Sequence, residues 1–132
     1  MLQTGILNPN ILELLARVRH TNTLVIADWA FPSWSEVPTV DISLTRGIPT
    51  ILDLLELLQP NFKVGRITQA QEFLSTNPPA TLKAFDDAFA GFADVRVERV
   101  PHLDFKSMVP KATGLIRTGD TTAYGNIILE SV

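Results

Sequence analysis

Short apolar runs alternate along the chain with longer segments in which leucine and other apolar residues recur every three or four positions. A run of four to eight apolar residues is typical of a strand, and the longer spacing is typical of an amphipathic helix. The run at 24–27 is apolar at every position, which predicts a strand buried on both faces of its sheet. The predicted strands are residues 24–27, 40–44, 64–69, 95–100, 114–117 and 126–130.

The segments between these strands carry helix signals. Asn10 with Glu13, and Thr50 with Asp53, have the spacing of a capping box at the start of two apolar-periodic segments. The predicted helices run from the Asn10 cap to about 19–20, from 51 to the Pro-Asn pair at 60–61, from about 80 to 90, and from 102 to 108. Because strands alternate with helices, we predict a layered α/β fold with helices on both faces of the sheet, in a single domain over residues 1–132.

Composition narrows the classes of function. The formal net charge of -3 and the absence of a basic run disfavour nucleic acid or an anionic membrane as the main partner. The chain has no cysteine, which excludes thiol catalysis and a cysteine-ligated metal. No apolar stretch approaches the ~20 residues that cross a bilayer, and the first residues lack the pattern of a signal peptide, so we expect no membrane insertion and a cytoplasmic location.

Two groups of polar residues stand at the ends of predicted strands. His20 and Asp28 flank the strand at 24–27, and Tyr124, Gly125 and Asn126 lead into the strand at 126–130. Rigid strand ends are where open α/β sheets build ligand sites. Imidazole, carboxylate, phenol and amide groups exchange protons and bind hydroxyl groups, which suits a sugar better than a phosphate or a redox cofactor.

Each candidate also has a structural interpretation. His20 falls where a helix is predicted to end, and spacing alone favours a histidine that stabilises the helix terminus. A strand of five or six residues is roughly 17–20 Å long, so His20 meets Asp28 only if the turn folds back or a second subunit contributes. Asp28 is equally compatible with a loop cap and with a residue that anchors a ligand. His102 and Lys106 share a face of the predicted helix at 102–108, and local spacing favours a solvated face.

Other site types lack their motifs. No glycine-rich phosphate loop with its lysine and no Gly-x-Ser-x-Gly nucleophile motif is present. The two histidines and scattered acids do not have zinc spacing. We therefore expect neither a metal nor an organic cofactor.

Taken in order, these residues resemble the D-ribose pyranase and L-fucose mutarotase family. The motifs that carry the resemblance are Leu7-Asn8, residues 17–28, Phe31-Pro32, residues 40–49, residues 102–106, residues 116–119 and residues 124–129. The family's general-acid histidine falls on His20. Its sugar-contacting residues fall on Asp28, His102, Lys106, Tyr124, Gly125 and Asn126.

The resemblance implies a three-layer α/β/α sandwich with a central mixed sheet. It also implies a ring-shaped homo-oligomer, a decamer or a smaller ring, with sites at subunit interfaces. In that assembly, His20 of one subunit would meet Asp28 of a neighbouring subunit, although the strand at 24–27 separates the two residues within one chain. The expected activity is cofactor-free interconversion of the pyranose, furanose and anomeric forms of an aldose, with D-ribose first and L-fucose or a related sugar next.

The chain departs from the family pattern at several positions. Arg19 and Asn22 stand where glycine and aspartate are usual around the histidine, and Trp29 follows Asp28 where alanine is usual. Gln71-Glu72 replaces an acidic pair, after a strand that carries Thr68-Gln69. These changes affect the expected sugar rather than the fold. A non-catalytic monosaccharide-binding auxiliary protein on the same fold is the alternative, and a structural ring subunit without ligand is a further one.

Overall fold

The computed structural model describes residues 1–3 and 5–132. Its helices are α1 (Pro9–Arg17), α2 (Ile51–Leu58), α3 (Glu72–Thr76), α4 (Pro79–Ala90) and α5 (His102–Met108), followed by the 3-10 turn η1 (Val109–Lys111). Its strands are β1 (Thr23–Ala27), β2 (Thr39–Asp41), β3 (Val64–Ala70), β4 (Arg96–Val100), β5 (Gly114–Arg117) and β6 (Ile127–Ser131). Among these residues no helix is long and apolar enough to cross a membrane.

The six strands form one mixed sheet in the order β2-β5-β1-β6-β3-β4. β6 lies at the centre and runs antiparallel to both of its neighbours, β1 and β3. The other pairs, β1 with β5, β2 with β5 and β3 with β4, are parallel. β6 therefore joins two parallel groups of strands into one sheet.

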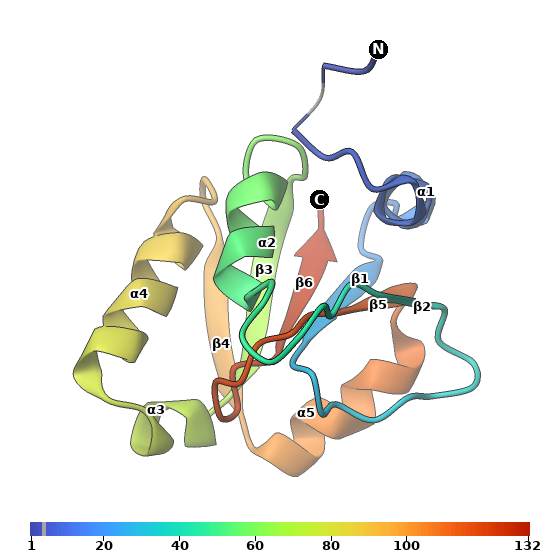
Figure 1. The fold of residues 1–132 in the computed structure, drawn as a ribbon. Coiled ribbons are helices and arrows are strands. Elements are labelled where there is room, and N and C mark those ends of the chain that lie inside the picture. Colours follow the sequence, from blue (N-terminus) through green and yellow to red (C-terminus); the bar gives the residue numbers. More distant parts are fainter. Residues whose placement is uncertain (4) are drawn as a thin grey trace.

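Helices cover both faces of this sheet (Figure 1). On one face α1, α2 and α4 pack on a core that includes Leu24, Ile26 and Ile67. On the other face Phe105 of α5 packs with Val25 and with side chains from the loop that follows β1. Alternate residues of β1 thus point into different cores, and all four residues from Leu24 to Ala27 are buried. The predicted three-layer α/β/α architecture with a mixed sheet is confirmed.

Of the two helix starts for which the sequence predicted a capping box, one is confirmed and one is not. The Thr50–Asp53 capping box is confirmed: Asp53 N donates to Thr50 Oγ1 at 3.1 Å and Thr50 N donates to Asp53 Oδ2 at 2.8 Å. The predicted Asn10 cap is wrong. Asn8 caps α1 instead, because Pro9 then occupies the first helical position, where its missing N–H leaves no bond unmade.

Some elements also differ from the sequence predictions. α1 ends at Arg17, before the predicted 19–20. β2 ends at Asp41 rather than at residue 44, since the chain then turns so that Leu44 N and Thr45 N both donate to Ile48 O. α3 is an additional helix that brief periodicity did not reveal.

Candidate functional site

A cavity of about 310 Å³ opens at the edge of the sheet where β1 ends and β6 begins. Because these strands are antiparallel, with Ile26 opposite Ile127, the residue after β1 and the residue before β6 are neighbours. The cavity is lined by Asp28, Ala30, Phe31, Pro32, His102, Lys106, Ala123, Tyr124 and Asn126. Its volume lies in the range that holds a small organic ligand.

Asp28 and Asn126 fix each other at this edge. Asp28 N donates to Asn126 Oδ1 at 2.6 Å, and Asn126 Nδ2 donates to Asp28 Oδ2 at 3.1 Å. Ala30 N donates to the other carboxylate oxygen, Asp28 Oδ1, at 2.9 Å. Each carboxylate oxygen has one acceptor in use and can accept a second hydrogen bond, so a ligand hydroxyl can still donate to this carboxylate.

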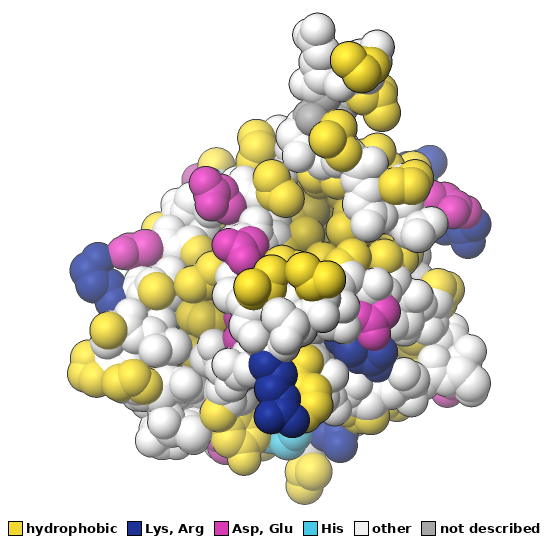
Figure 2. All heavy atoms as spheres, in the orientation of Figure 1, with side chains coloured by type: hydrophobic (Ala, Val, Ile, Leu, Met, Phe, Trp, Pro, Cys, Tyr) yellow, Lys and Arg dark blue, Asp and Glu magenta, His cyan; other side chains and the backbone are white. Residues whose placement is uncertain are grey.

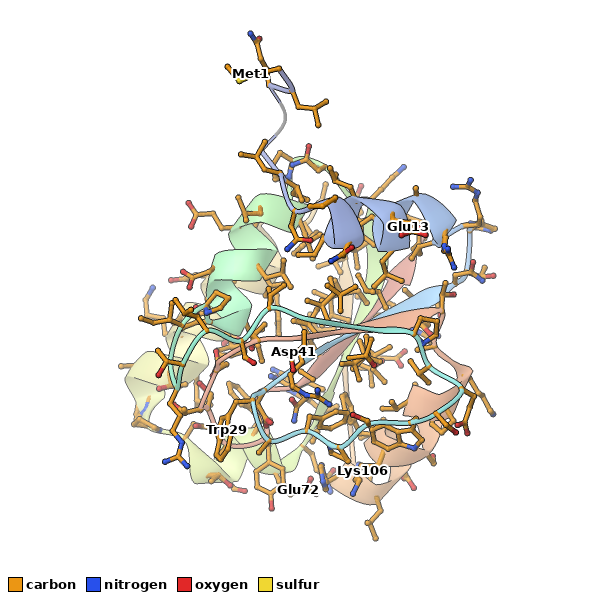
Figure 3. The ribbon with its side chains drawn as sticks, turned by 45° about the vertical axis from the view of Figure 1, so that its right-hand side comes forward. Met1, Glu13, Trp29, Asp41, Glu72 and Lys106 are labelled. Carbon is orange, nitrogen blue, oxygen red and sulfur yellow. The ribbon has the colours of Figure 1, made fainter. Side chains whose placement is uncertain are left out.

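α5 contributes His102 and Lys106, which lie one turn apart on the same face. The His102 and Tyr124 rings meet edge to face with centroids 5.1 Å apart. Glu72 Oε2 accepts a hydrogen bond from His102 N at 2.8 Å and so anchors the start of α5. In Figure 3, Glu72 and Lys106 lie near the end of the molecule that is opposite Met1 and Glu13.

Ala123, Tyr124 and Asn126 form the third wall, and Gly125 is not among the lining residues. Tyr124 has φ of 54°, in the left-handed region. Gly125 is buried, and a Cβ added there would lie 3.1 Å from both Cβ and the carbonyl oxygen of Thr122. Glycine therefore permits the close approach expected at this position.

His20 lies outside the cavity. It is exposed in the turn between α1 and β1, whereas Asp28 follows the other end of β1, roughly 17 Å of strand away. Arg19 N donates to Asn22 Oδ1 at 3.0 Å and Asn22 N donates to Arg19 O at 2.9 Å, so Asn22 holds the turn rather than the imidazole. Because α1 ends at Arg17, the interpretation of His20 as a residue of the last helical turn is wrong.

Trp29 is also not among the residues that line the cavity. Its side chain is 43% exposed, and the Arg46 guanidinium carbon lies 4.4 Å from the centre of its ring. On the face drawn in Figure 2, a basic side chain (dark blue) lies next to hydrophobic side chains (yellow) in the lower part of the molecule. Within one chain the tryptophan is therefore paired with a cation and does not fill the cavity.

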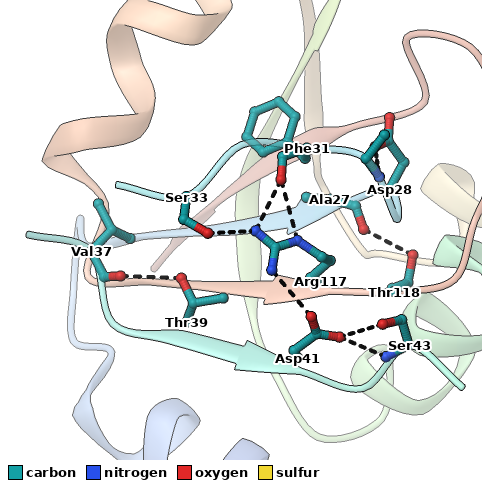
Figure 4. A network of polar contacts seen from close by, with 11 residues as sticks. Ala27, Asp28, Phe31, Ser33, Val37, Thr39, Asp41, Ser43, Arg117 and Thr118 are labelled. Atoms are coloured by element: carbon teal, nitrogen blue, oxygen red, sulfur yellow. Dashed lines mark hydrogen bonds and ion pairs between the residues drawn. The ribbon is translucent and has the colours of Figure 1, made fainter. Parts of the chain in front are cut away.

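Sequence reasoning gave no role to Arg117, which fixes the loop after β1 (Figure 4). Its guanidinium donates to Phe31 O through Nη2 at 2.9 Å and Nε at 3.2 Å, and to Ser33 Oγ at 2.9 Å. Nη1 donates to Asp41 Oδ2 at 3.1 Å. The hydrogen bond from the Ser43 hydroxyl, aided by Arg117, holds the pKa of Asp41 below its ordinary value. The only sequence signal was the place of Arg117 in the motif at 116–119.

In the part of the chain that the structure describes, no group of three or more His, Asp or Glu side chains is placed to hold a metal ion. The cavity instead offers one carboxylate, one imidazole, one ammonium, one phenol and one carboxamide. These groups donate to and accept from hydroxyl groups and can transfer protons.

Comparisons with known proteins show the family of this chain. The model of the RbsD / FucU transport protein family matches residues 1–132. A D-ribose pyranase of Geobacillus kaustophilus is 38% identical over 99% of this chain and 93% of its own length. A D-ribose pyranase of Bacillus licheniformis is 39% identical over 99% of this chain and 97% of its own length.

Solved structures show the same fold. The structure of Bacillus subtilis RbsD complexed with D-ribose has a TM-score of 0.89 and 32% identity, and it covers 99% of this chain and 97% of that one. A fucose mutarotase in complex with L-fucose from Streptococcus pneumoniae has a TM-score of 0.78 at 21% identity, with 99% and 97% of the two chains covered. The second likeness supports the fold alone.

Proposed function

Since the chain belongs to the RbsD / FucU transport protein family, we propose that it is an isomerase that interconverts the ring forms of a monosaccharide. D-ribose is the first candidate substrate, because full-length relatives at 38% and 39% identity are D-ribose pyranases. L-fucose or a related aldose is the next candidate. The single observation that carries the proposal is the convergence of Asp28, His102, Lys106, Tyr124 and Asn126 on one cavity.

The proposed reaction opens and recloses the sugar ring. A base removes the proton of the anomeric hydroxyl, the bond between C1 and the ring oxygen breaks as the aldehyde forms, and an acid protonates the ring oxygen. Closure by the same hydroxyl on the other face gives the other anomer, and attack by the 4-hydroxyl gives the furanose. The reaction is redox-neutral, so acid–base groups suffice.

The cavity residues divide this work by their chemistry. The Asp28 carboxylate accepts hydrogen bonds from sugar hydroxyls, and His102 and Lys106 bind further hydroxyl oxygens. Tyr124 and Asn126, with Gly125 between them, position the anomeric end. Positioned acid–base groups give accelerations of roughly 10²–10⁴-fold, which suffices for a reaction that already proceeds slowly in water.

His20 is the proposed acid for the ring oxygen, because the general-acid histidine of the family that this chain resembles falls on this position. Histidine can both give and take protons near neutral pH. One copy of the chain keeps His20 and the cavity at opposite ends of β1. The proposal therefore requires that His20 of a neighbouring copy complete the cavity. A ring-shaped homo-oligomer, a decamer or a smaller ring, would do this at every subunit interface.

Saturation-transfer NMR between the ring forms of D-ribose, and then of L-fucose, tests the activity. We expect faster exchange with the wild type and a loss of roughly 10²-fold or more in His20→Ala. Arg19→Ala is the matched control, since the turn uses only the backbone N and O of Arg19. Equal exchange in His20→Ala and wild type would contradict the role of His20.

One observation favours a second candidate, a non-catalytic monosaccharide-binding protein: the hydroxyl-binding groups converge within one chain, whereas His20 does not. That candidate predicts sugar binding without faster exchange of ring forms. Size-exclusion chromatography with light scattering separates the two, because a monomer has no partner to supply His20.

A further inference from the structure

Beside the cavity, two carboxamide side chains hold the backbone on either side of Tyr124. Asn77 Nδ2 donates to Ala123 O at 2.8 Å, and Gln69 Nε2 donates to Gly125 O at 3.4 Å. We propose that Gln69 and Asn77 are positioning residues, which set where Tyr124 and Asn126 present their side chains to the sugar. The inference rests on the proposed function of this cavity and adds residues that do not line it.

The conformation of Tyr124 requires such support. A bulky side chain at φ of 54° is in a region that L-residues rarely adopt, and it persists only where the surroundings determine it. The two carboxamides bind the carbonyls of the residues before and after Tyr124, and the His102 ring packs against its side chain. The Ala123–Tyr124 peptide group is therefore restrained by Asn77, which follows α3, and the Gly125–Asn126 peptide group is restrained by Gln69 of β3.

Gln69 is an unusual residue for its place in the sheet. It is 0% exposed and shares a strand face with Ile67, which belongs to the core under α2 and α4. Its Oε1 is buried and, among the described residues, has no hydrogen-bond partner. A core position that leaves a buried acceptor unpaired is expected at functional rather than purely structural positions. The donor to Gly125 is what the side chain contributes here.

Asn77 makes two bonds with one nitrogen. Besides Ala123 O, its Nδ2 donates to Phe73 O at 3.0 Å, four residues back, which closes the end of α3. The first bond links α3 to the segment that lines the cavity, and the second is an ordinary helix-end contact. A variant of Asn77 therefore loses both bonds. Its control must lose only a helix-end bond of the kind that Asn77 makes to Phe73 O.

The chain supplies matched controls for both residues. Gln59 Nε2 donates to Ala88 O at 2.7 Å, which is the same kind of bond between α2 and α4, and neither residue lines the cavity. Asn61 Nδ2 donates to Leu57 O at 2.8 Å, again four residues back, without a bond to the cavity segment. Gln59→Met and Asn61→Ala therefore repeat the chemistry of Gln69→Met and Asn77→Ala away from Tyr124.

Gln69→Met is the more informative variant, because it should weaken sugar binding without lowering the stability of the protein. Methionine has a similar volume, fills irregular core space and removes the unpaired acceptor together with the donor. We expect an unchanged or raised melting temperature. We also expect KM for the sugar to rise about two- to tenfold, the range that one neutral hydrogen bond covers, with kcat within about twofold.

The experiment combines exchange kinetics over a range of D-ribose concentrations with amide hydrogen exchange of residues 122–126 in the sugar-free protein. We expect Gln69→Met and Asn77→Ala to raise KM and to speed hydrogen exchange in that segment, and Gln59→Met and Asn61→Ala to do neither. Unchanged KM and unchanged hydrogen exchange in both test variants would overturn the proposal, as would an equal rise of KM in the controls.

The two readouts keep this proposal separate from the proposed function. If the wild type fails to accelerate exchange of any aldose, the isomerase proposal fails on its own. Hydrogen exchange, and the affinity for D-ribose measured by calorimetry, then decide the positioning role. The positioning role is overturned if Gln69→Met and Asn77→Ala, compared with their controls, neither speed hydrogen exchange of residues 122–126 nor weaken the affinity for D-ribose.

Discussion

Asn126 shows how a single side chain sets up the site. Its carboxamide accepts from the Asp28 backbone and donates to the Asp28 carboxylate, and only 5% of the residue is exposed. A carboxylate of the same shape would keep the first bond and lose the second, because it has no hydrogen to donate. The order of donor and acceptor atoms on this residue therefore determines how Asp28 is held.

We predict that Asn126→Asp is destabilised by about 1–3 kcal/mol at pH 8, because two carboxylates then face each other at a buried edge. Urea unfolding of variant and wild type measures this deficit. An unchanged free energy of unfolding would show that the carboxamide of Asn126 does not stabilise this edge of the sheet.

At the scale of elements, α2 and the segment that follows β5 are tied together at a helix start. Thr50 and Asp53 close the capping box, and Asp120 Oδ2 accepts from Ile51 N at 2.8 Å. Asp120 Oδ1 also accepts from Thr122 N at 2.7 Å, so one buried carboxylate joins the start of α2 to the chain that leads to Tyr124.

Thr50→Ala should lower the free energy of unfolding by about 1 kcal/mol, because Asp53 N loses its acceptor. Thr50→Ser keeps an oxygen in place and should remain within about 0.5 kcal/mol of the wild type. Thermal and urea unfolding of the pair give both values. If serine costs as much as alanine, packing of the threonine methyl group rather than the cap is responsible.

An ion pair at the edge strand β2 makes part of the folding stability depend on pH. Arg117 of β5 binds Asp41 of β2, and the pKa of Asp41 is lowered by its Ser43 and Arg117 hydrogen bonds. A carboxylate with a lowered folded-state pKa contributes stability above its unfolded pKa, about 3.9, and loses it as pH falls through the folded value. Asp41→Asn should therefore be less stable than the wild type at pH 7.

We expect the difference in stability between the wild type and Asp41→Asn to shrink as the pH falls below about 4, because the carboxyl group of the unfolded wild type then takes up a proton before the folded one does. Urea unfolding from pH 7 down to pH 3 follows it. A constant difference across that range would mean that the shape of the side chain, and not its charge, stabilises β2.

Local signals predicted some elements to the residue and others poorly. The helix at 102–108 and the strand at 114–117 were predicted at their observed bounds, since proline and glycine mark their starts. The start of α1 was missed because two asparagines compete there and only the position of Pro9 decides between them. α3 has five residues, too few for a helical period to be visible.

The candidate site was only partly predictable for a related reason. Asp28 and Asn126 stand at the ends of predicted strands, which marked them as candidates, whereas His102 was assigned to the site through the family resemblance. Arg117 acts through the carbonyl of Phe31, and Gln69 is directed at the carbonyl of Gly125. Such contacts depend on how distant segments pack, which a linear pattern does not contain.

At the scale of the whole molecule, the two ends of β1 carry different parts of the proposed chemistry. His20 precedes the strand and Asp28 follows it. If His20 is the acid, as proposed, a complete site needs two copies of the chain, and a head-to-tail contact that closes into a ring would give each copy one site. This requirement can be tested without solving the assembly.

Neither His20→Ala nor Asp28→Asn should be active alone, but refolding them together should restore activity. If subunits mix at random, about a quarter of the sites receive both intact residues, so roughly a quarter of wild-type exchange should return. The variants mixed without unfolding serve as the control. No recovery after joint refolding would contradict a site shared between subunits.

The central position of β6 has a consequence for how the protein is made. β6 comes later in the chain than the five other strands, yet it is the one that joins β1 to β3. Until residues 127–131 have left the ribosome, β1 and β3 each lack the neighbour that β6 supplies, so the six-stranded sheet cannot form. A chain cut short before Ile127 would leave the edges of β1 and β3 unpaired, and unpaired strand edges favour aggregation.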